Sequence, residues 1–143
     1  MKILIPMAGH GDRFIAAGYK DPKPLIKVNG KRIIEYVVEM FSPDDEFVFI
    51  CDEGHLKNTN MLSVLSDLPI KNRTVLGIES HSDGPVHTIL QVQGHFSDDE
   101  ELIVCYCDNP YLWDYETFKK HVKDTIIIII RAYFYIKFTA AAV

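Results

Sequence analysis

The chain has 143 residues, of which 48% are hydrophobic, and this content can bury the core of one modest domain without disulfides. Its net charge of −5 excludes a nucleic-acid-binding surface, because such a surface needs clustered lysine and arginine. The three cysteines form neither a zinc-binding spacing nor the paired framework of a secreted protein, and no leader opens the chain, so we expect a cytoplasmic protein.

Apolar stretches with strand character alternate with stretches of helical periodicity. We predict, in chain order, a strand at 2–6, a helix at 32–41, a strand at 46–51, a helix at 55–65, a strand at 73–78, a helix at 85–93, a strand at 102–107 and a helix at 115–122. This alternation is typical of a Rossmann-like α/β fold, a three-layer sandwich in which helices cover both faces of a mostly parallel central sheet. In such sheets, ligands bind outside the carboxyl ends of the strands.

A glycine loop follows the first predicted strand. Gly9 and Gly11 can adopt positive φ angles that let backbone amides point at phosphate oxygens. Arg13 supplies a planar fork of donors, and Lys23, held between two prolines, supplies a compact point charge. A Walker A loop would need Gly-Lys-Ser/Thr and a dinucleotide-binding loop would need glycine in place of Phe14, so neither motif is present. The combination predicts a site for a triphosphate.

Asp108 follows the predicted strand at 102–107, so it should lie at the same sheet edge as the glycine loop. A carboxylate there can bind Mg²⁺, which takes oxygen ligands and bridges substrate phosphates. The alternative role is a turn former, because Asn109 and Pro110 come next. Asp114 either joins the metal through water or caps the helix at 115–122, and we favour capping. The histidines show no spacing typical of metal ligands, and we assign none of them a role.

These motifs resemble the signature of the sugar-phosphate nucleotidyltransferases, which have a glycosyltransferase-A-like fold. The similarity covers residues 1–122 and includes Gly-x-Gly-x-Arg at 9–13, Pro-Lys-Pro-Leu at 22–25, a glycine turn and helix at 82–90, and Cys-Asp at 107–108. It implies that a nucleoside triphosphate reacts with a sugar 1-phosphate or similar phosphomonoester to give an NDP-sugar and pyrophosphate. The Trp-Asp pair at 113–114 resembles a feature of one branch of the family, which is associated with surface-polysaccharide precursors.

The resemblance also implies residue roles. Arg13 would hold the leaving pyrophosphate, Lys23 would lie near the α-phosphate, and Asp108 would bind Mg²⁺, so these three are the expected catalytic residues. The expected nucleotide-binding residues are Ala8, Gly9, Gly11, Arg13, Lys23, Gly84 and Thr88. For Thr88, inward packing is an equally open alternative. The implied partners are a nucleoside triphosphate and a sugar phosphate.

The chain departs from the family pattern in two places. Asp12 stands where the family usually carries threonine or serine, and we expect it to point away from the phosphates or to pair with Arg13. Family members are usually longer and hold the acceptor phosphate in a second part, so we expect 1–143 to be a truncated single domain. Two alternatives stay open: a glycosyltransferase, which normally has Asp-x-Asp where this chain has Asp-Asn-Pro at 108–110, and a non-catalytic nucleotide-binding module.

An atypical apolar tail occupies residues 123–143. A membrane span wants about 20 predominantly apolar residues, whereas Arg131 and Lys137 interrupt a stretch rich in β-branched and aromatic residues. We therefore predict no membrane span but a buried fifth strand. An unpaired strand at a sheet edge promotes aggregation, so we expect it to pair within the fold or with a second copy, which would make a homo-oligomer.

Overall fold

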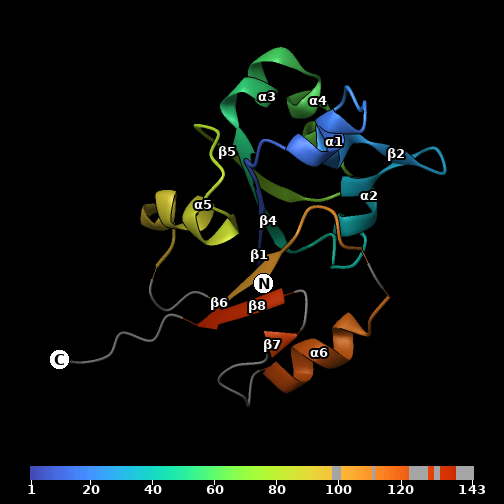
Figure 1. Cartoon of the computed structure of the whole chain (residues 1–143). Coiled ribbons are helices and arrows are strands. Elements are labelled where there is room, and N and C mark those ends of the chain that lie inside the picture. Colours follow the sequence, from blue (N-terminus) through green and yellow to red (C-terminus); the bar gives the residue numbers. More distant parts are fainter. Residues whose placement is uncertain (98–100, 111, 123–128, 131–132, 138–143) are drawn as a thin grey trace.

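The protein is described by a computed structural model, which places residues 1–97, 101–110, 112–122, 129–130 and 133–137, with side chains up to residue 122 (Figure 1). The strands are β1 Lys2–Met7, β2 Lys27–Val28, β3 Lys31–Arg32, β4 Glu46–Asp52, β5 Asn72–Ile78, β6 Glu101–Cys105, β7 Ile129–Ile130 and β8 Tyr133–Lys137. The α-helices are α1 Asp12–Ala16, α2 Ile33–Val38, α3 Glu53–Asn58, α4 Met61–Asp67, α5 Pro85–Gln91 and α6 Tyr115–Val122. Two 3₁₀ turns are η1 Lys23–Leu25 and η2 Gln93–His95.

The central sheet has the strand order β5-β4-β1-β6-β8-β7. Strands β5, β4, β1 and β6 run parallel, with Lys2 of β1 opposite Glu46 of β4 and Leu102 of β6. Strands β8 and β7 continue the sheet in antiparallel pairing. A separate hairpin joins β2 to β3, and its turn uses positive φ angles at Asn29 and Gly30.

Successive residues of β1 face opposite sides of the sheet and enter two different cores. Ile3 and Ile5 pack with buried side chains of α2, α4 and α6. Leu4 and Ala8 pack on the other face, which α5 and the residues after it cover. Figure 1 shows α5 on one side of the sheet and α2 and α6 on the other. The predicted three-layer α/β sandwich with a mostly parallel sheet is therefore confirmed.

Two predicted helices differ from the observed ones. The helix predicted at 32–41 ends at Val38, and Ile33 is only half-buried, although the other apolar positions enter the core. The helix predicted at 55–65 is divided into α3 and α4 because Thr59 is extended. The Thr59 hydroxyl donates to the His55 carbonyl at 2.7 Å and accepts from the Met61 amide at 3.2 Å, so one side chain ends the first helix and supports the start of the second.

The prediction that Asp108 ends a strand at 102–107 is wrong in its detail. Strand β6 ends at Cys105, and Asp108 lies in the turn that follows. In the tail, pairing within the fold is confirmed, because β8 runs antiparallel to β6. Residues 123–128, 131–132 and 138–143 lie outside the described residues. The predicted burial of the tail strand concerns side chains that are also outside the described part, so it stays a prediction. None of the helices in the described part of the chain has the length and apolar character needed to cross a bilayer.

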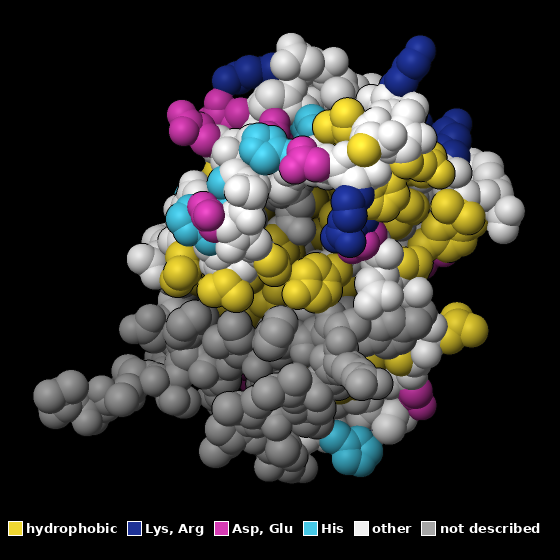
Figure 2. Space-filling view, viewed as in Figure 1, with side chains coloured by type: hydrophobic (Ala, Val, Ile, Leu, Met, Phe, Trp, Pro, Cys, Tyr) yellow, Lys and Arg dark blue, Asp and Glu magenta, His cyan; other side chains and the backbone are white. Residues whose placement is uncertain are grey.

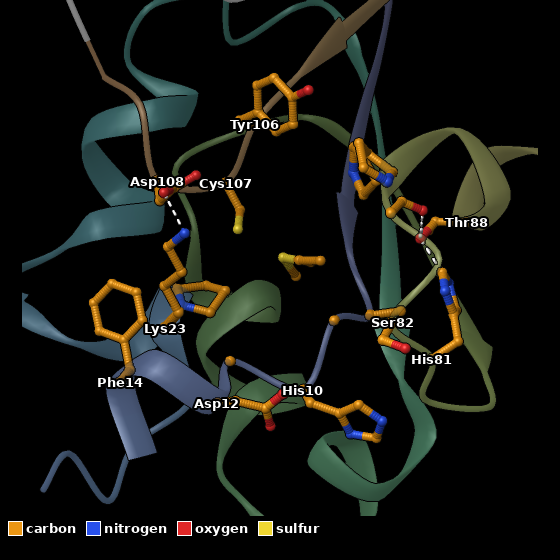
Figure 3. Close-up of a pocket in the computed structure, with 18 of the residues that line it drawn as sticks. His10, Asp12, Phe14, Lys23, His81, Ser82, Thr88, Tyr106, Cys107 and Asp108 are labelled. Atoms are coloured by element: carbon orange, nitrogen blue, oxygen red, sulfur yellow. Dashed lines mark hydrogen bonds and ion pairs between the residues drawn. The ribbon is translucent and has the colours of Figure 1, made fainter. Parts of the chain in front are cut away.

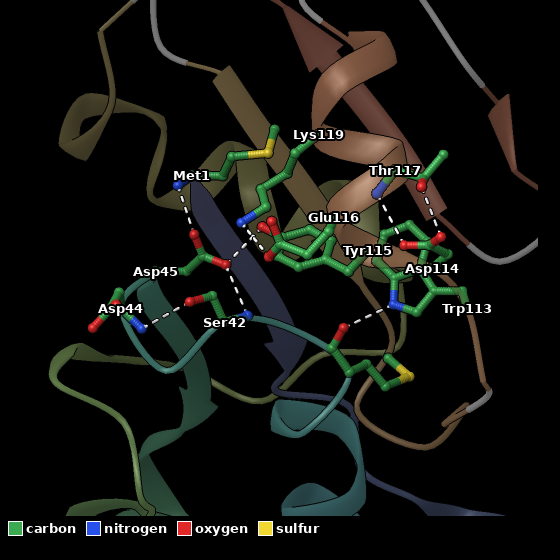
Figure 4. A network of polar contacts seen from close by, with 11 residues as sticks. Met1, Ser42, Asp44, Asp45, Trp113, Asp114, Tyr115, Glu116, Thr117 and Lys119 are labelled. Atoms are coloured by element: carbon green, nitrogen blue, oxygen red, sulfur yellow. Dashed lines mark hydrogen bonds and ion pairs between the residues drawn. The ribbon is translucent and has the colours of Figure 1, made fainter.

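A polar network closes the sheet at the amino ends of the parallel strands (Figure 4). The buried Asp45 carboxylate accepts from the Met1 amino group at 2.8 Å, from the Ser42 amide at 3.1 Å and from the Tyr115 hydroxyl at 2.6 Å. The indole of Trp113 donates to the carbonyl of Met40 at 2.8 Å. These contacts fix the start of α6 against the edge of the core.

Candidate functional site

The strand order creates a topological switch point between β1 and β6. From β1 the chain passes to β4 and then β5 on one side, whereas β6 lies on the other side of β1. The loops that leave β1 and β6 therefore diverge at the carboxyl ends of adjacent strands, and this is where ligands bind in open parallel sheets. The glycine loop follows β1, and Asp108 follows β6.

A cleft of about 410 Å³ opens at this switch point (Figure 2). Its walls include every residue to which the sequence assigned a site role: Ala8, Gly9, Gly11, Arg13, Lys23, Gly84, Thr88 and Asp108. The volume suits a small-molecule ligand. The structure thus brings all predicted site residues together, while their individual roles stay predictions.

The glycine loop turns tightly into α1. Gly11 has a φ of +72°, and its carbonyl accepts the amides of Phe14 at 2.8 Å and Ile15 at 3.2 Å. Gly9 does not share this conformation, which corrects the expectation for it; it lies in a parallel bridge with His81. The bridge joins the loop after β1 to the loop after β5, so the backbone of both loops borders one cleft.

Lys23 and Asp108 form an ion pair across the switch point, with side chains 26% and 32% exposed. The Lys23 ammonium also lies 5.0 Å from the centre of the Phe14 ring, within range of a cation–π contact. Pro22 and Pro24 on either side are buried, which fixes the backbone that carries this amine. The pair lies across the cleft from α5 (Figure 3).

Arg13 and Asp12 begin α1 and line the same cleft. Both side chains are exposed, and within the described part of the chain no ion pair joins them. Of the two arrangements expected for Asp12, pairing with Arg13 is therefore not observed. The Arg13 guanidinium remains available to an anionic ligand.

The opposite wall of the cleft is the start of α5. Gly84 precedes the helix with φ +88° and ψ 175°, a conformation that only glycine adopts readily. Thr88 is 2% exposed, and its hydroxyl lies 2.9 Å from His81 Nε2 and donates to the Gly84 carbonyl at 3.4 Å. Inward packing is thus the observed arrangement of Thr88, although it still borders the cleft.

The cysteines near the cleft are protonated at neutral pH. Burial, followed by the neighbouring Asp108 carboxylate, raises the pKa of Cys107 to about 12, although Lys23 partly opposes this shift. Burial, followed by Cys107 and Asp52, raises the pKa of Cys51 to about 12, and burial likewise raises the pKa of Cys105. A thiol in this state is a poor nucleophile, so the cleft is not suited to cysteine chemistry.

Sequence reasoning missed several residues that line the cleft, notably Phe14, His55 and His81. His55 lies in the first turn of α3, and its Nδ1 is a buried polar atom with no hydrogen-bond partner among the described residues. One signal could have found it, because it comes three residues after the carboxyl end of β4. His81 had no comparable signal, because its position depends on the bridge to Gly9.

Trp113 and Asp114 have structural roles in the described part of the chain. Asp114 accepts from the Thr117 amide at 2.9 Å and hydroxyl at 2.7 Å, so the capping role expected for it is confirmed. Trp113 packs against Phe41, Tyr115 and Phe118. Neither residue lines the cleft at the switch point.

Several solved structures share this fold. A nucleoside-diphosphate-sugar pyrophosphorylase from Vibrio cholerae RC9 is 21% identical with a TM-score of 0.62, over 82% of this chain and 52% of its own. A UDP-glucose pyrophosphorylase complexed with UDP-glucose is 19% identical with a TM-score of 0.63, over 85% and 53%. HddC from Yersinia pseudotuberculosis complexed with GMP-PN is 20% identical with a TM-score of 0.62, over 88% and 56%. The TM-scores show a shared fold, and at these low identities the likeness shows the fold alone. The chain spans about half the length of each of these structures.

No curated protein sequence matches the chain significantly. A family model described as the MobA-like NTP transferase domain matches residues 3–125. That match covers most of the chain, including both walls of the cleft, and agrees with the resemblance drawn from the motifs. The chain belongs to the family of MobA-like NTP transferase domains.

Proposed function

We propose that the chain binds a nucleoside triphosphate in the cleft and transfers its nucleotidyl group to a sugar 1-phosphate or similar phosphomonoester, with release of pyrophosphate. The observation that carries this proposal is the convergence of the glycine loop, Arg13, Lys23 and Asp108 on one cleft at the switch point. Family membership and the pyrophosphorylase fold of the similar structures support it.

The two cations divide the triphosphate between them. The exposed Arg13 fork would bind the pyrophosphate that leaves, because a guanidinium matches two phosphate oxygens at once. Lys23 would bind near the α-phosphate, where the incoming phosphate oxygen also approaches. Backbone amides of the loop from Gly9 to Gly11 would complete the contacts to the phosphates.

The ion pair between Lys23 and Asp108 would open when the ligand arrives. A phosphate oxygen can replace the Asp108 carboxylate as the partner of Lys23, which releases the carboxylate. Asp108 then fits Mg²⁺, because it is a partly exposed oxygen ligand in the cleft and this ion is usually held by one or two carboxylates plus substrate phosphates. Bound there, the ion would neutralise part of the negative charge of the triphosphate.

The acceptor needs little chemical activation from the protein. A phosphate monoester is already ionised, so the reaction depends mainly on alignment and charge neutralisation and requires no general base. Ala8 and Gly84 would border the nucleoside. Thr88 would hold Gly84 in place through the hydrogen bond from its hydroxyl to the Gly84 carbonyl.

A wider role in the synthesis of surface-polysaccharide precursors in the cytoplasm belongs to the same proposal. Its motivation is the Trp-Asp pair at 113–114, although both residues also have structural roles. Residues 1–143 would form a single nucleotidyltransferase-like domain, and its assembly with a second copy stays a prediction.

The test is an assay of pyrophosphate release with Mg²⁺, each nucleoside triphosphate and a panel of sugar 1-phosphates. A thermal-shift screen of the same nucleotides should show stabilisation of about 2.7 kcal/mol at one hundred times the dissociation constant. The Arg13→Ala variant should lose that shift, whereas Lys27→Ala, which changes an exposed lysine outside the cleft, should keep it.

Each outcome of this assay has a separate meaning. Nucleotide binding without pyrophosphate release under any combination would contradict the transferase proposal and favour a non-catalytic binding module. Sugar transfer or hydrolysis from an NDP-sugar, without synthesis of one, would favour a glycosyltransferase.

A further inference from the structure

Two histidines and one aspartate converge at the rim of the cleft. His81 lies in the loop after β5, Asp83 follows it, and His87 lies in the first turn of α5. One ligand atom from each of these side chains lies within 4.8 Å of the other two. The spacing along the chain predicted no such group, because the turn at Gly84 is what folds His87 back over the loop.

The three side chains face one another and are accessible to solvent. The imidazole rings of His81 and His87 lie 4.6 Å apart between centres, and His87 Nε2 lies 3.9 Å from Asp83 Oδ2. The side chains of His87 and Asp83 are 46% and 65% exposed, so an ion can reach them without any movement of the fold. Histidine and acidic side chains gather on the surface over α5 in Figure 2.

The hydrogen bonds of His81 suit a metal-binding imidazole. Its Nδ1 accepts only a long bond of 3.2 Å from the Asp83 amide, which a metal ion could replace. Its Nε2 lies 2.9 Å from the hydroxyl of the buried Thr88. A ligating histidine almost always donates its other ring N–H to a fixed partner, which sets the tautomer and the orientation of the ring. Thr88 is such a partner.

We propose that His81, Asp83 and His87 bind a divalent transition-metal ion, with Zn²⁺ as the best fit and water completing the coordination. Two imidazoles and one carboxylate match zinc, whereas Mg²⁺ prefers oxygen ligands. This site is separate from the magnesium site proposed at Asp108, because His81 lies on the opposite wall of the cleft (Figure 3) and Asp83 and His87 do not line the cleft. A bound ion would tie the loop after β5 to the first turn of α5.

Zn²⁺ titration of the protein without a histidine tag, followed by calorimetry and with Mg²⁺ in excess throughout, tests this proposal. We expect one Zn²⁺ per chain, and a d–d absorption band typical of tetrahedral coordination when Co²⁺ replaces Zn²⁺. His87→Ala and Asp83→Asn should each weaken zinc binding by about tenfold or more, since even outer partners of metal ligands cost tenfold to one-hundredfold. The matched control is His95→Ala, which removes an exposed histidine outside the cluster.

Two results would overturn the proposal: the wild type does not bind zinc, or His87→Ala binds it as tightly as the wild type. The cluster would then be a surface contact between side chains. Thermal unfolding without metal should be the same for the wild type and the variants, which shows that they fold. The test is independent of the proposed function because no nucleotide is present. Asp108→Asn should retain zinc binding, so failure of the nucleotide site and failure of the zinc site are distinguishable.

Discussion

At the amino ends of the parallel strands, polar groups are buried and pair with one another, whereas at the carboxyl ends charged groups lie partly exposed around a cleft. Asp45 is 5% exposed and accepts three hydrogen bonds from groups of its own chain. The side chains of Lys23 and Asp108 are 26% and 32% exposed and form an ion pair with each other. Figures 3 and 4 show the two arrangements.

This difference separates what stabilises the fold from what is available to a ligand. Removing a partner from a buried carboxylate costs free energy, because the unpaired group remains buried and cannot form hydrogen bonds with water instead. A partly exposed ion pair contributes little to stability and can be exchanged for a ligand at little cost. Substitutions at the two ends should therefore affect different measurements.

The largest expected effect is on activity, from Lys23→Ala. Because Lys23 would stabilise charge on the reacting phosphates, we expect kcat/KM for pyrophosphate release to fall about 10²-fold to 10³-fold. The free energy of unfolding should change by less than about 1 kcal/mol, since the partner is a partly exposed carboxylate. Steady-state kinetics and urea unfolding measure the two quantities. An equal loss of activity in Lys27→Ala, outside the cleft, would show that the loss is not specific to Lys23 and would contradict the role proposed for it.

At the opposite end, Tyr115→Phe should act on stability alone. Burial, with the Asp45 carboxylate that accepts its hydrogen bond, raises the pKa of Tyr115 far above its ordinary value, so the hydroxyl is a permanent donor. Removing this donor from a buried carboxylate should lower the free energy of unfolding by about 1 to 3 kcal/mol. Urea unfolding checks the value, and Tyr19→Phe, at a half-exposed ring, is the matched control. Loss of nucleotide affinity in Tyr115→Phe would contradict the claim that substitutions at the amino ends affect stability alone.

Gly84→Ala tests for backbone strain at the cleft, at the carboxyl ends of the strands. A Cβ at Gly84 would have open space, but the φ of +88° is unfavourable for alanine, so we expect a cost of about 1 to 2 kcal/mol. Gly9→Ala is the control, because a Cβ there also has open space and its φ is not positive; it should change stability by less than about 0.5 kcal/mol. Equal unfolding midpoints for both variants would contradict the assigned conformation of Gly84.

The smallest expected effect concerns Asp52, which caps α3 at the carboxyl end of β4 by accepting from the His55 amide at 2.8 Å. Burial alone would raise the pKa of Asp52, but hydrogen bonds from Ser80 and His55 outweigh it and lower the pKa. The stabilisation is therefore present above the unfolded pKa, about 3.9, and is lost as the pH falls through the lower folded value. Asp52→Ala should cost about 1 kcal/mol at neutral pH.

Urea unfolding of Asp52→Ala and the wild type over a range of acidic pH measures this effect. The difference between the two should shrink as the pH falls from about 3.9, the unfolded pKa, towards the lower folded pKa. Asp52→Asn is the control, because asparagine caps the helix at every pH without a charge. A difference that does not depend on pH would show that the charge of Asp52 adds nothing to its capping role.

The positions of the strands and the chemistry of the cleft followed from local features of the sequence. Alternating apolar runs place β1, β4 and β5 within one or two residues of their predicted bounds. Gly9 and Arg13 line the cleft as expected, since the residues just after a parallel strand emerge at its carboxyl end, and Lys23 also lines it. Hydrophobic periodicity is a property of a short segment, so it can be read from the sequence alone.

Which side chains meet depends on how the segments pack against one another. The sequence spacing predicts neither the pairing of Lys23 with Asp108 nor the grouping of His81, Asp83 and His87. The first depends on β6 lying next to β1, and the second depends on a glycine conformation and on a bridge between two loops. Local sequence patterns are enough to predict the elements and the residues available at their ends. Contacts between segments are set by strand order and loop dihedrals, which depend on the packing of the whole chain.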